Sequence, residues 1–257
     1  MIRLIASDID GTLLQVGQRN IDPVIFQEIR RLRRAGILFC PASGRQYGSM
    51  RRLFAPIADE VHYLCENGAV VYGPGSPGPV LGKAPMDRAL ALELCQAILE
   101  EPDCEVLISG DNISYLCPKQ QDFVDHMRYF VGNNVTIIPS PEDIQEDILK
   151  VAAYCRRGAE AERPRLAPRW ENRCRVAIAG WEWLDFNQTD KGAGLRQLCA
   201  ALDIGLDQVM AFGDSGNDLA MLELAGRPYL MDNAAPGLRA HFPHHCRRVE
   251  DILRQLP

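Results

Sequence analysis

The sequence predicts an α/β fold in which a mostly parallel sheet carries an inserted α+β domain. Short apolar segments alternate with helical patterns near both ends of the chain, as in parallel sheets with right-handed crossovers. Between them the pattern changes to a helix followed by hairpin-like strands. The chain has 257 residues, 47% of them apolar, which is enough for two cores. We therefore expect residues 1–83 and 184–257 to form one domain and residues 84–183 to form the other.

The first elements of the core domain follow from apolar runs and helix boundary signals. Residues 2–7 are mostly apolar, which suits a short central strand buried on both faces. A helix is expected to begin with Asp22 as its cap and Pro23 in its first turn, and to stop at Gly36. Further short strands are expected at 37–40 and 62–65.

The inserted block and the return to the core are predicted in the same way. In the insert we expect a helix at 87–101, a hairpin at 105–117, a helix at 120–131, and strands near 147–155 and 174–186. The segment 156–170 is expected to be irregular. After it, the core resumes with a helix at 191–202, a strand ending at Gly213, a helix and a last strand at 228–231. The segment His244, His245 and Cys246 is expected to lie in a solvated tail.

Composition excludes several classes of function. A net charge of −6 disfavours binding to nucleic acid. No run of 18 apolar residues occurs, and the start MIRLIASD reaches a charge too early for a secretory signal, so we expect a cytoplasmic protein that does not enter a membrane. The nine cysteines are unclustered and predict neither disulfides nor a zinc site.

Polar clusters fall where predicted strands end or helices begin. They are Asp8 with Asp10, Ser43 with Gly44, Lys191, and Asp214 with Asn217 and Asp218. Each alone could be an ordinary turn or cap. Ligands of open parallel sheets bind beyond the carboxyl ends of the strands, and carboxylates converging there would repel one another without a cation. Oxygen ligands without Cys or His favour Mg²⁺, and a hydroxyl, a turn N–H and a lysine suit phosphate, so the set indicates phosphoryl transfer.

Four motifs occur in order: DIDGT (8–12), ASGR (42–45), DKG (190–192) and GDSGND (213–218). Together with ENGA (66–69), they make the chain resemble the haloacid dehalogenase-like hydrolase superfamily, most closely its Cof-type sugar-phosphate phosphatases, over its whole length. The resemblance implies a Rossmann-like core with an α+β cap that selects the substrate. It also implies an Mg²⁺-dependent phosphatase that cleaves small phosphomonoesters through an aspartyl-phosphate.

The resemblance assigns roles to matching positions. It makes Asp8 the nucleophile and an Mg²⁺ ligand, Asp10 the general acid/base and a ligand through its backbone carbonyl, and Asp214 the third ligand. The phosphate is expected to contact Ser43, the Gly44 N–H, Lys191, Asn217 and the Ile9 N–H. Asp218 would orient neighbouring groups and Arg45 would lie at the rim. Thr189 and Asp190 depart from the small residue and serine that similar proteins often have.

Alternatives remain open at this point. A phosphomutase or phosphotransferase of the same superfamily would use the same residues. A phospho-switch or non-catalytic binding protein would also use an acceptor aspartate, although Asp10 and the insert argue against it, since an acid/base beside the acceptor speeds hydrolysis. The expected partner is a small phosphorylated metabolite, with the protein a monomer or weak homodimer.

Overall fold

A computed structural model describes residues 1–15 and 17–257. The chain divides into two compact units. The first comprises Met1–Ser43, Met50–Lys83 and Asp190–Pro257, and the second comprises Gly44–Ser49 and Ala84–Thr189. The predicted fold class is confirmed: the first unit is built on a parallel sheet and the second is an α+β insertion.

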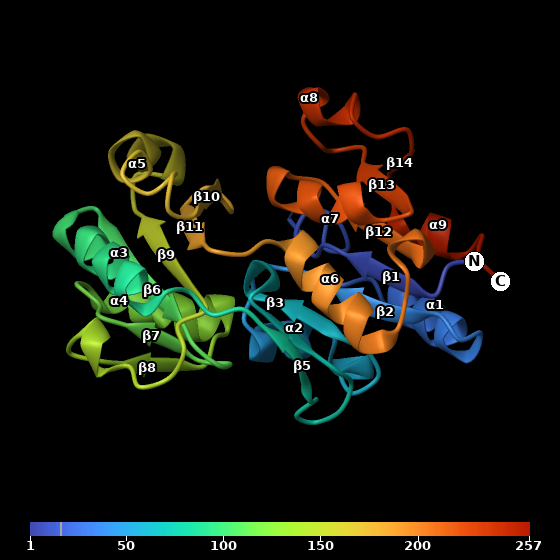
Figure 1. The fold of residues 1–257 in the computed structure, drawn as a ribbon, viewed down its shortest axis with the longest axis horizontal. Helices are drawn as coiled ribbons and strands as arrows, with labels where there is room; N and C mark the ends of the chain where they lie inside the picture. The colour runs from blue at the N-terminus through green and yellow to red at the C-terminus, as the bar shows by residue number, and fades with distance from the viewer. Residues whose placement is uncertain (16) are drawn as a thin grey trace. The chain divides into compact units, whose positions relative to one another are not determined.

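The main sheet of the first unit has the strand order β14-β13-β12-β1-β2, with every pair parallel (Figure 1). Its strands are β1 (Leu4–Ser7), β2 (Leu38–Pro41), β12 (Val209–Gly213), β13 (Arg227–Met231) and β14 (His245–Cys246). β1 lies in the interior of this sheet and all four of its residues are buried. This burial on both faces explains why the strand reads as a continuous apolar run.

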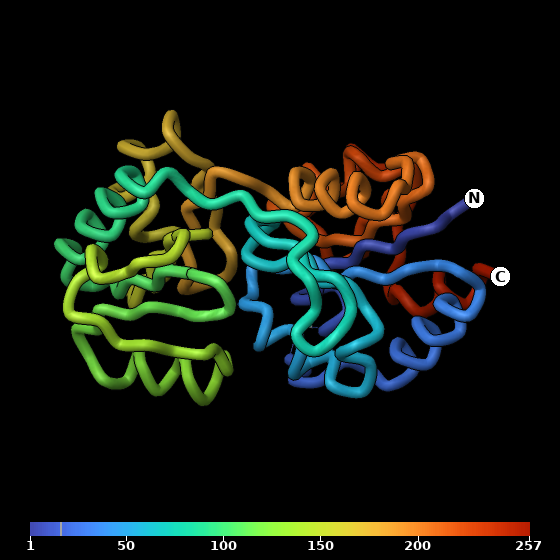
Figure 2. The backbone as a smooth tube through the Cα atoms, turned by 60° about the horizontal axis from the view of Figure 1, so that its bottom comes forward, coloured from blue at the N-terminus to red at the C-terminus, as the bar shows by residue number. Residues whose placement is uncertain are grey.

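Helices and a small antiparallel sheet complete the first unit. The helices are α1 (Pro23–Arg34), α2 (Tyr47–Leu53, which begins in the second unit), α6 (Lys191–Leu202), α7 (Leu219–Leu224), α8 (Pro236–Arg239) and α9 (Val249–Leu253). The small sheet contains β3 (Tyr63–Cys65), β4 (Val70–Tyr72) and β5 (Val80–Lys83). Figure 2 shows the two termini near each other at one end of this unit.

Local signals explain the helix ends. Asp22 caps α1 by accepting a hydrogen bond from Val24 N, and Pro23 occupies the first turn, as predicted. The chain leaves the helix through Gly36, whose φ of +82° is a left-handed conformation that glycine adopts at low cost. On α6, buried Leu195 and Leu198 belong to the same apolar cluster as β1, which fastens this helix to the sheet.

The second unit contains a six-stranded sheet of order β10-β11-β9-β6-β7-β8, antiparallel except for the pair β7 and β8. Its strands are β6 (Cys104–Ser109), β7 (Ser114–Leu116), β8 (Val135–Ile137), β9 (Lys150–Cys155), β10 (Arg175–Ile178) and β11 (Trp183–Asn187). Its helices are α3 (Arg88–Glu100), α4 (Gln121–Asp125, continued by a π-helical turn His126–Val131) and α5 (Ala159–Leu166). The predicted hairpin is present as β6 and β7, closed by a hydrogen bond from Gly110 N to Ile113 O.

The segment 44–49 joins the second unit through hydrogen bonds. Lys150 Nζ donates to Gly44 O at 2.8 Å, and Gly48 N donates to Asn112 Oδ1 at 2.7 Å. The side chain of Gln46 donates to Ser114 Oγ at 3.2 Å. These bonds explain why a short stretch of the first half of the chain groups with the insert.

The structure differs from the sequence expectations at three places. Residues 156–170 are not irregular but contain α5, whose buried Glu162 forms ion pairs with Arg157 and Arg165. These contacts and the burial of Leu166 hold a helix despite Pro164, which removes a backbone donor. Residues 244–246 are not a solvated tail, because β14 extends the parallel sheet. The boundary expected at residue 184 falls inside β11, which pairs with both β9 and β10.

The structure also shows the state of the cysteines and the length of the helices. All nine cysteines are free and eight of them are buried, where they pack as small apolar residues. In the described parts of the chain, no helix is both long and apolar enough to span a membrane.

Candidate active site

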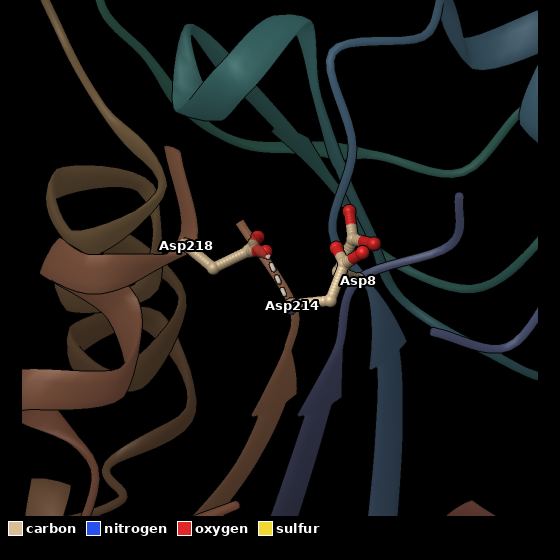
Figure 3. Close-up of side chains that lie close together, drawn as sticks. All are labelled: Asp8, Asp214 and Asp218. Carbon is tan, nitrogen blue, oxygen red and sulfur yellow. Dashed lines mark hydrogen bonds between the residues drawn. The ribbon is translucent and has the colours of Figure 1, made fainter. Parts of the chain in front are cut away.

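Asp8 and Asp214 follow neighbouring strands of the parallel sheet. β1 and β12 pair in parallel, with Ser7 opposite Phe212, so the loops that follow them leave the sheet at the same edge. Asp8, Asp214 and Asp218 each offer a carboxylate oxygen, and these oxygens all lie within 4.8 Å of one another. Figure 3 shows the Asp218 side chain extending toward the other two. The fold thus gathers acidic groups that are about 200 residues apart in sequence into one cluster.

Lys191 connects Asp8 to Asp218. It is the first residue of α6, whose N-terminus is capped by the Asp190 side chain, which accepts from Ala193 N at 2.7 Å. Lys191 Nζ lies 2.6 Å from Asp8 Oδ1 and 2.6 Å from Asp218 Oδ1. The lysine side chain is 0% exposed. Such short charge-assisted bonds in a buried place hold all three side chains in one geometry.

Asp218 has both of its carboxylate oxygens engaged by protein groups. Its Oδ2 accepts the backbone N–H of Asp214 and of Ser215, each at 3.0 Å, while Oδ1 receives Lys191. These bonds hold the turn that follows β12. Asp218 therefore fixes the position of its neighbours and has less capacity left for an added ligand than Asp8 or Asp214.

Two buried carboxylate oxygens, Asp8 Oδ2 and Asp214 Oδ1, have no hydrogen-bond partner among the described residues. A buried polar atom without a partner is costly, so these positions call for a ligand. The atoms come from carboxylates that approach each other, with no sulfur or imidazole in the group. This donor set fits a hard cation such as Mg²⁺.

The charges in the cluster also favour a bound cation. Burial, reinforced by the Asp218 carboxylate, raises the pKa of Asp8 to about 8, although Lys191 opposes the shift. Burial and Asp218 likewise raise the pKa of Asp214 to about 6. Burial alone would lower the pKa of the Lys191 ammonium, but Asp218 and Asp8 outweigh it and raise that pKa. When all three carboxyl groups are ionised, one ammonium leaves two negative charges, which a divalent cation would neutralise.

Gly11 and Asn233 support the position of Asp214. Asn233 Nδ2 donates to Gly11 O at 3.0 Å and to Asp214 Oδ2 at 2.9 Å. Gly11 has a φ of +89°, and a Cβ at this position would overlap Asp214 Oδ2. Glycine is therefore required by both the backbone conformation and the close approach of the carboxylate.

Asn67 links two of the residues expected to bind phosphate. Its backbone N donates to Ser43 O at 3.0 Å, and its side-chain Oδ1 accepts from Asn217 Nδ2 at 3.4 Å. Ser43 follows β2 and is buried, and Asn217 belongs to the 3₁₀ turn Gly216–Asp218. The structure thus connects the second and fourth motifs through the ENGA segment.

The remaining expected site residues lie in different surroundings. Asp10 is exposed, in a turn closed by a hydrogen bond from Gly11 N to Leu14 O at 2.9 Å. Ile9 is buried, and its carbonyl accepts from the backbone of Leu14 at 2.7 Å. Gly44 and Arg45 belong to the second unit. The roles assigned to these residues remain predictions.

Sequence reasoning missed the contributions of Asn67, Gly11 and Asn233. The sequence position of Asn233 could have indicated its role. It comes two residues after β13, so its loop leaves the sheet at the same edge as the loop of Asp214. The signals for the other two were weaker. The close approach of Gly11 to Asp214 depends on packing between loops that are distant in sequence.

The fold and this acidic cluster define a class of enzyme. The chain matches the family described as haloacid dehalogenase-like hydrolase over residues 5–251, and it belongs to that family. The resemblance inferred from the motifs is confirmed, and so is the assignment to the hydrolases.

Three relatives illustrate the similarity. The chain is 26% identical to the 5-amino-6-(5-phospho-D-ribitylamino)uracil phosphatase YbjI of Escherichia coli over 249 residues, 93% of this chain and 88% of that protein. It is 26% identical to the HMP-PP phosphatase of Cronobacter sakazakii over 259 residues, 96% of this chain and 92% of that protein. A crystal structure from Eubacterium rectale matches with a TM-score of 0.85 and 31% identity, covering 99% of this chain and 98% of the other.

Proposed function

We propose that this protein is an Mg²⁺-dependent phosphatase that hydrolyses small phosphomonoesters through an aspartyl-phosphate on Asp8. The observation that carries the proposal is the buried Asp8 carboxylate. One of its oxygens is 2.6 Å from Lys191 Nζ and the other is unpaired, and the carboxylate lies in the same cluster as that of Asp214, which also has an unpaired oxygen. This arrangement suits a carboxylate that protein groups hold in place and that has capacity left for a metal ion and a phosphoryl group.

The residues present fit a magnesium ion. Asp8 Oδ2 and Asp214 Oδ1 would hold it, and the family resemblance adds the backbone carbonyl of Asp10. When bound, Mg²⁺ would offset the negative charge of both the phosphate and the cluster, so that an anionic nucleophile can approach an anionic substrate. The ion would also lower the pKa of Asp8, which is about 8 without it, and so keep the carboxylate ionised near neutral pH.

The reaction then has two steps. In the first, the Asp8 carboxylate attacks phosphorus, a bond forms between the carboxylate oxygen and phosphorus, and the bond to the leaving oxygen breaks while Asp10 gives that oxygen a proton. In the second, Asp10 accepts a proton from water, the water oxygen attacks phosphorus, and Asp8 leaves as a carboxylate. The products are the alcohol and inorganic phosphate, and Asp10 ends protonated as it began.

Other residues of this chain would hold the transferred phosphate. Lys191 brings a fixed positive charge next to Asp8. Ser43 offers a hydroxyl and Asn217 an amide, and Asn67 ties the two together. Donors placed in advance where negative charge develops lower the barrier, because they need not reorganise during the reaction.

The substrate class is proposed from the relatives. Two of them are named as phosphatases of small phosphorylated metabolites, a ribitylaminouracil phosphate and HMP-PP. We propose that the substrate of this chain also belongs to the small sugar phosphates or related metabolites. A screen of purified protein against a library of phosphorylated metabolites, read by release of inorganic phosphate, would identify it.

The reaction itself is tested with p-nitrophenyl phosphate in the presence and absence of Mg²⁺. We expect turnover only with Mg²⁺, and a loss of at least about 100-fold in Asp8→Asn. Asp251→Asn is the matched control, because Asp251 is an exposed aspartate on α9 of the same unit. A stable phosphorylated protein without turnover would favour a phospho-switch, and transfer of the phosphoryl group to a second metabolite would favour a phosphotransferase.

A further inference from the structure

The loop after β13 lies next to the loop that carries Asp214. β13 pairs with β12 in parallel, with Leu230 opposite Gly213, so both loops leave the same edge of the sheet. Asn233 extends from the β13 loop to the other two loops of the cluster. Its Nδ2 donates to Asp214 Oδ2 at 2.9 Å and to Gly11 O at 3.0 Å. An amide nitrogen carries two hydrogens, so it can serve both acceptors at once.

This contact determines how the Asp214 carboxylate is oriented. With Oδ2 taken by Asn233, the other oxygen, Oδ1, is the one left unpaired and buried in the cluster. The backbone N–H of Asp214 is separately fixed by Asp218, so the main chain and the side chain are held by different partners. Protein groups alone therefore fix the orientation of the Asp214 carboxylate.

The same donor serves two acceptors that belong to different loops. Gly11 lies so close to Asp214 Oδ2 that a Cβ could not be accommodated. The Gly11 carbonyl and the Asp214 carboxylate both carry negative charge at their oxygens, and both are bound by the same amide. Loss of that amide would remove the bond between the two loops and free the carboxylate to rotate.

We propose that Asn233 is a positioning residue that presents Asp214 Oδ1 to the metal. The inference rests on the proposed magnesium site. Partners that orient a ligand in this way commonly change metal affinity by about 10- to 100-fold when they are removed. Asn233 acts through Asp214 and has no contact with the reacting atoms in this assignment.

Metal binding is measured directly, without catalysis. The probe is Mn²⁺, followed by the EPR signal of the free ion and competed with Mg²⁺. The variants are Asn233→Ala, which truncates the side chain, and Asn233→Leu, which keeps its volume but has no donor. Asn172→Ala is the matched control, because Asn172 is an exposed asparagine of the second unit. We expect both Asn233 variants to bind Mn²⁺ and Mg²⁺ about tenfold more weakly, and the control to match wild type.

Two further measurements separate positioning from folding. Asn233 is exposed, so its variants should melt within about 2 °C of wild type without metal. With p-nitrophenyl phosphate, the Mg²⁺ concentration for half-maximal rate should rise by the same factor as Kd, while kcat at saturating Mg²⁺ stays within about twofold. A lower melting temperature with unchanged Kd would assign Asn233 to fold stability and overturn the inference.

The failure of the inference is distinguishable from the failure of the proposed function. If wild type binds Mg²⁺ and both Asn233 variants bind it equally well, only the role of Asn233 is refuted. If wild type binds neither Mn²⁺ nor Mg²⁺, the proposed metal site is refuted, and the role of Asn233 with it.

Discussion

Replacing Lys191 by methionine tests how the acidic cluster is held together. Methionine is similar in length and flexible, so it can fill the space without creating a large cavity. The change removes two ion pairs of 2.6 Å from a side chain that is 0% exposed, and it leaves Asp8 and Asp218 without their shared cation. Removing one partner of a buried pair typically costs about 3–5 kcal/mol. For a chain of this size we expect the melting temperature to fall by roughly 10 °C.

The loss of stability in Lys191→Met should depend on pH. Burial and Asp218 raise the pKa of Asp8 from 3.8 to about 8 even beside Lys191, so between pH 4 and pH 7 this carboxyl is protonated and the lost ammonium matters less. Without Lys191, which lowers this pKa, folded Asp8 should keep its proton above pH 8, where folded wild type releases it and the unfolded chain has already done so. The destabilisation relative to wild type should therefore change little between pH 4 and pH 7 and grow above pH 8.

The three tryptophans, Trp170, Trp181 and Trp183, all lie in the second unit. Their fluorescence reports on the insert, whereas calorimetry and circular dichroism report on both units. We expect the calorimetric transition of Lys191→Met to shift in metal-free buffer, with a smaller change in fluorescence. Lys83→Met, at a half-buried lysine of β5, is the control. A shift equal to that of the control, or one that does not grow above pH 8, would refute the reasoning.

Three further predictions concern the same loops. Asp10→Asn should lower kcat by at least about 100-fold with p-nitrophenyl phosphate, and an unchanged kcat would remove its acid/base role. The metal-free protein should lose stability in calorimetry as pH rises from 4 to 8, because the raised pKa values of Asp8 (about 8) and Asp214 (about 6) make the folded state hold more protons than the unfolded one. Added Mg²⁺ should raise the melting temperature most at pH 8. A melting temperature of the metal-free protein that does not change with pH would argue against buried, uncompensated carboxylates. Gly11→Ala should lower both the melting temperature and Mg²⁺ affinity, since the residue has φ of +89° and no room for a Cβ; a fully wild-type variant would contradict this packing.

Some of this geometry was accessible from the sequence. Asp8 and Asp214 each follow an apolar strand, and parallel strands end at the same edge, so their approach could be expected once a parallel sheet was inferred. The helix beginning at Lys191 could be read from its cap, Asp190. These inferences needed only local patterns and the rule that governs parallel sheets.

Other features depend on contacts that local patterns do not contain. Asn233 acts through bonds to Gly11 and Asp214, which lie in two other loops. α5 forms although Pro164 argues against a helix, because Leu166 is buried in the insert. Packing of this kind outweighs local propensity, and a single sequence does not reveal it.

The attachment of residues 44–49 to the insert affects how chimaeras of this protein should be built. Gln46 and Gly48 bond to side chains of Ser114 and Asn112, so these partners are matched to each other within this chain. Grafting should therefore transfer two pieces of chain, with junctions after Ser43 and before Met50 as well as after Lys83 and before Asp190. Deleting only 84–189 to obtain a minimal core would leave these donors without partners.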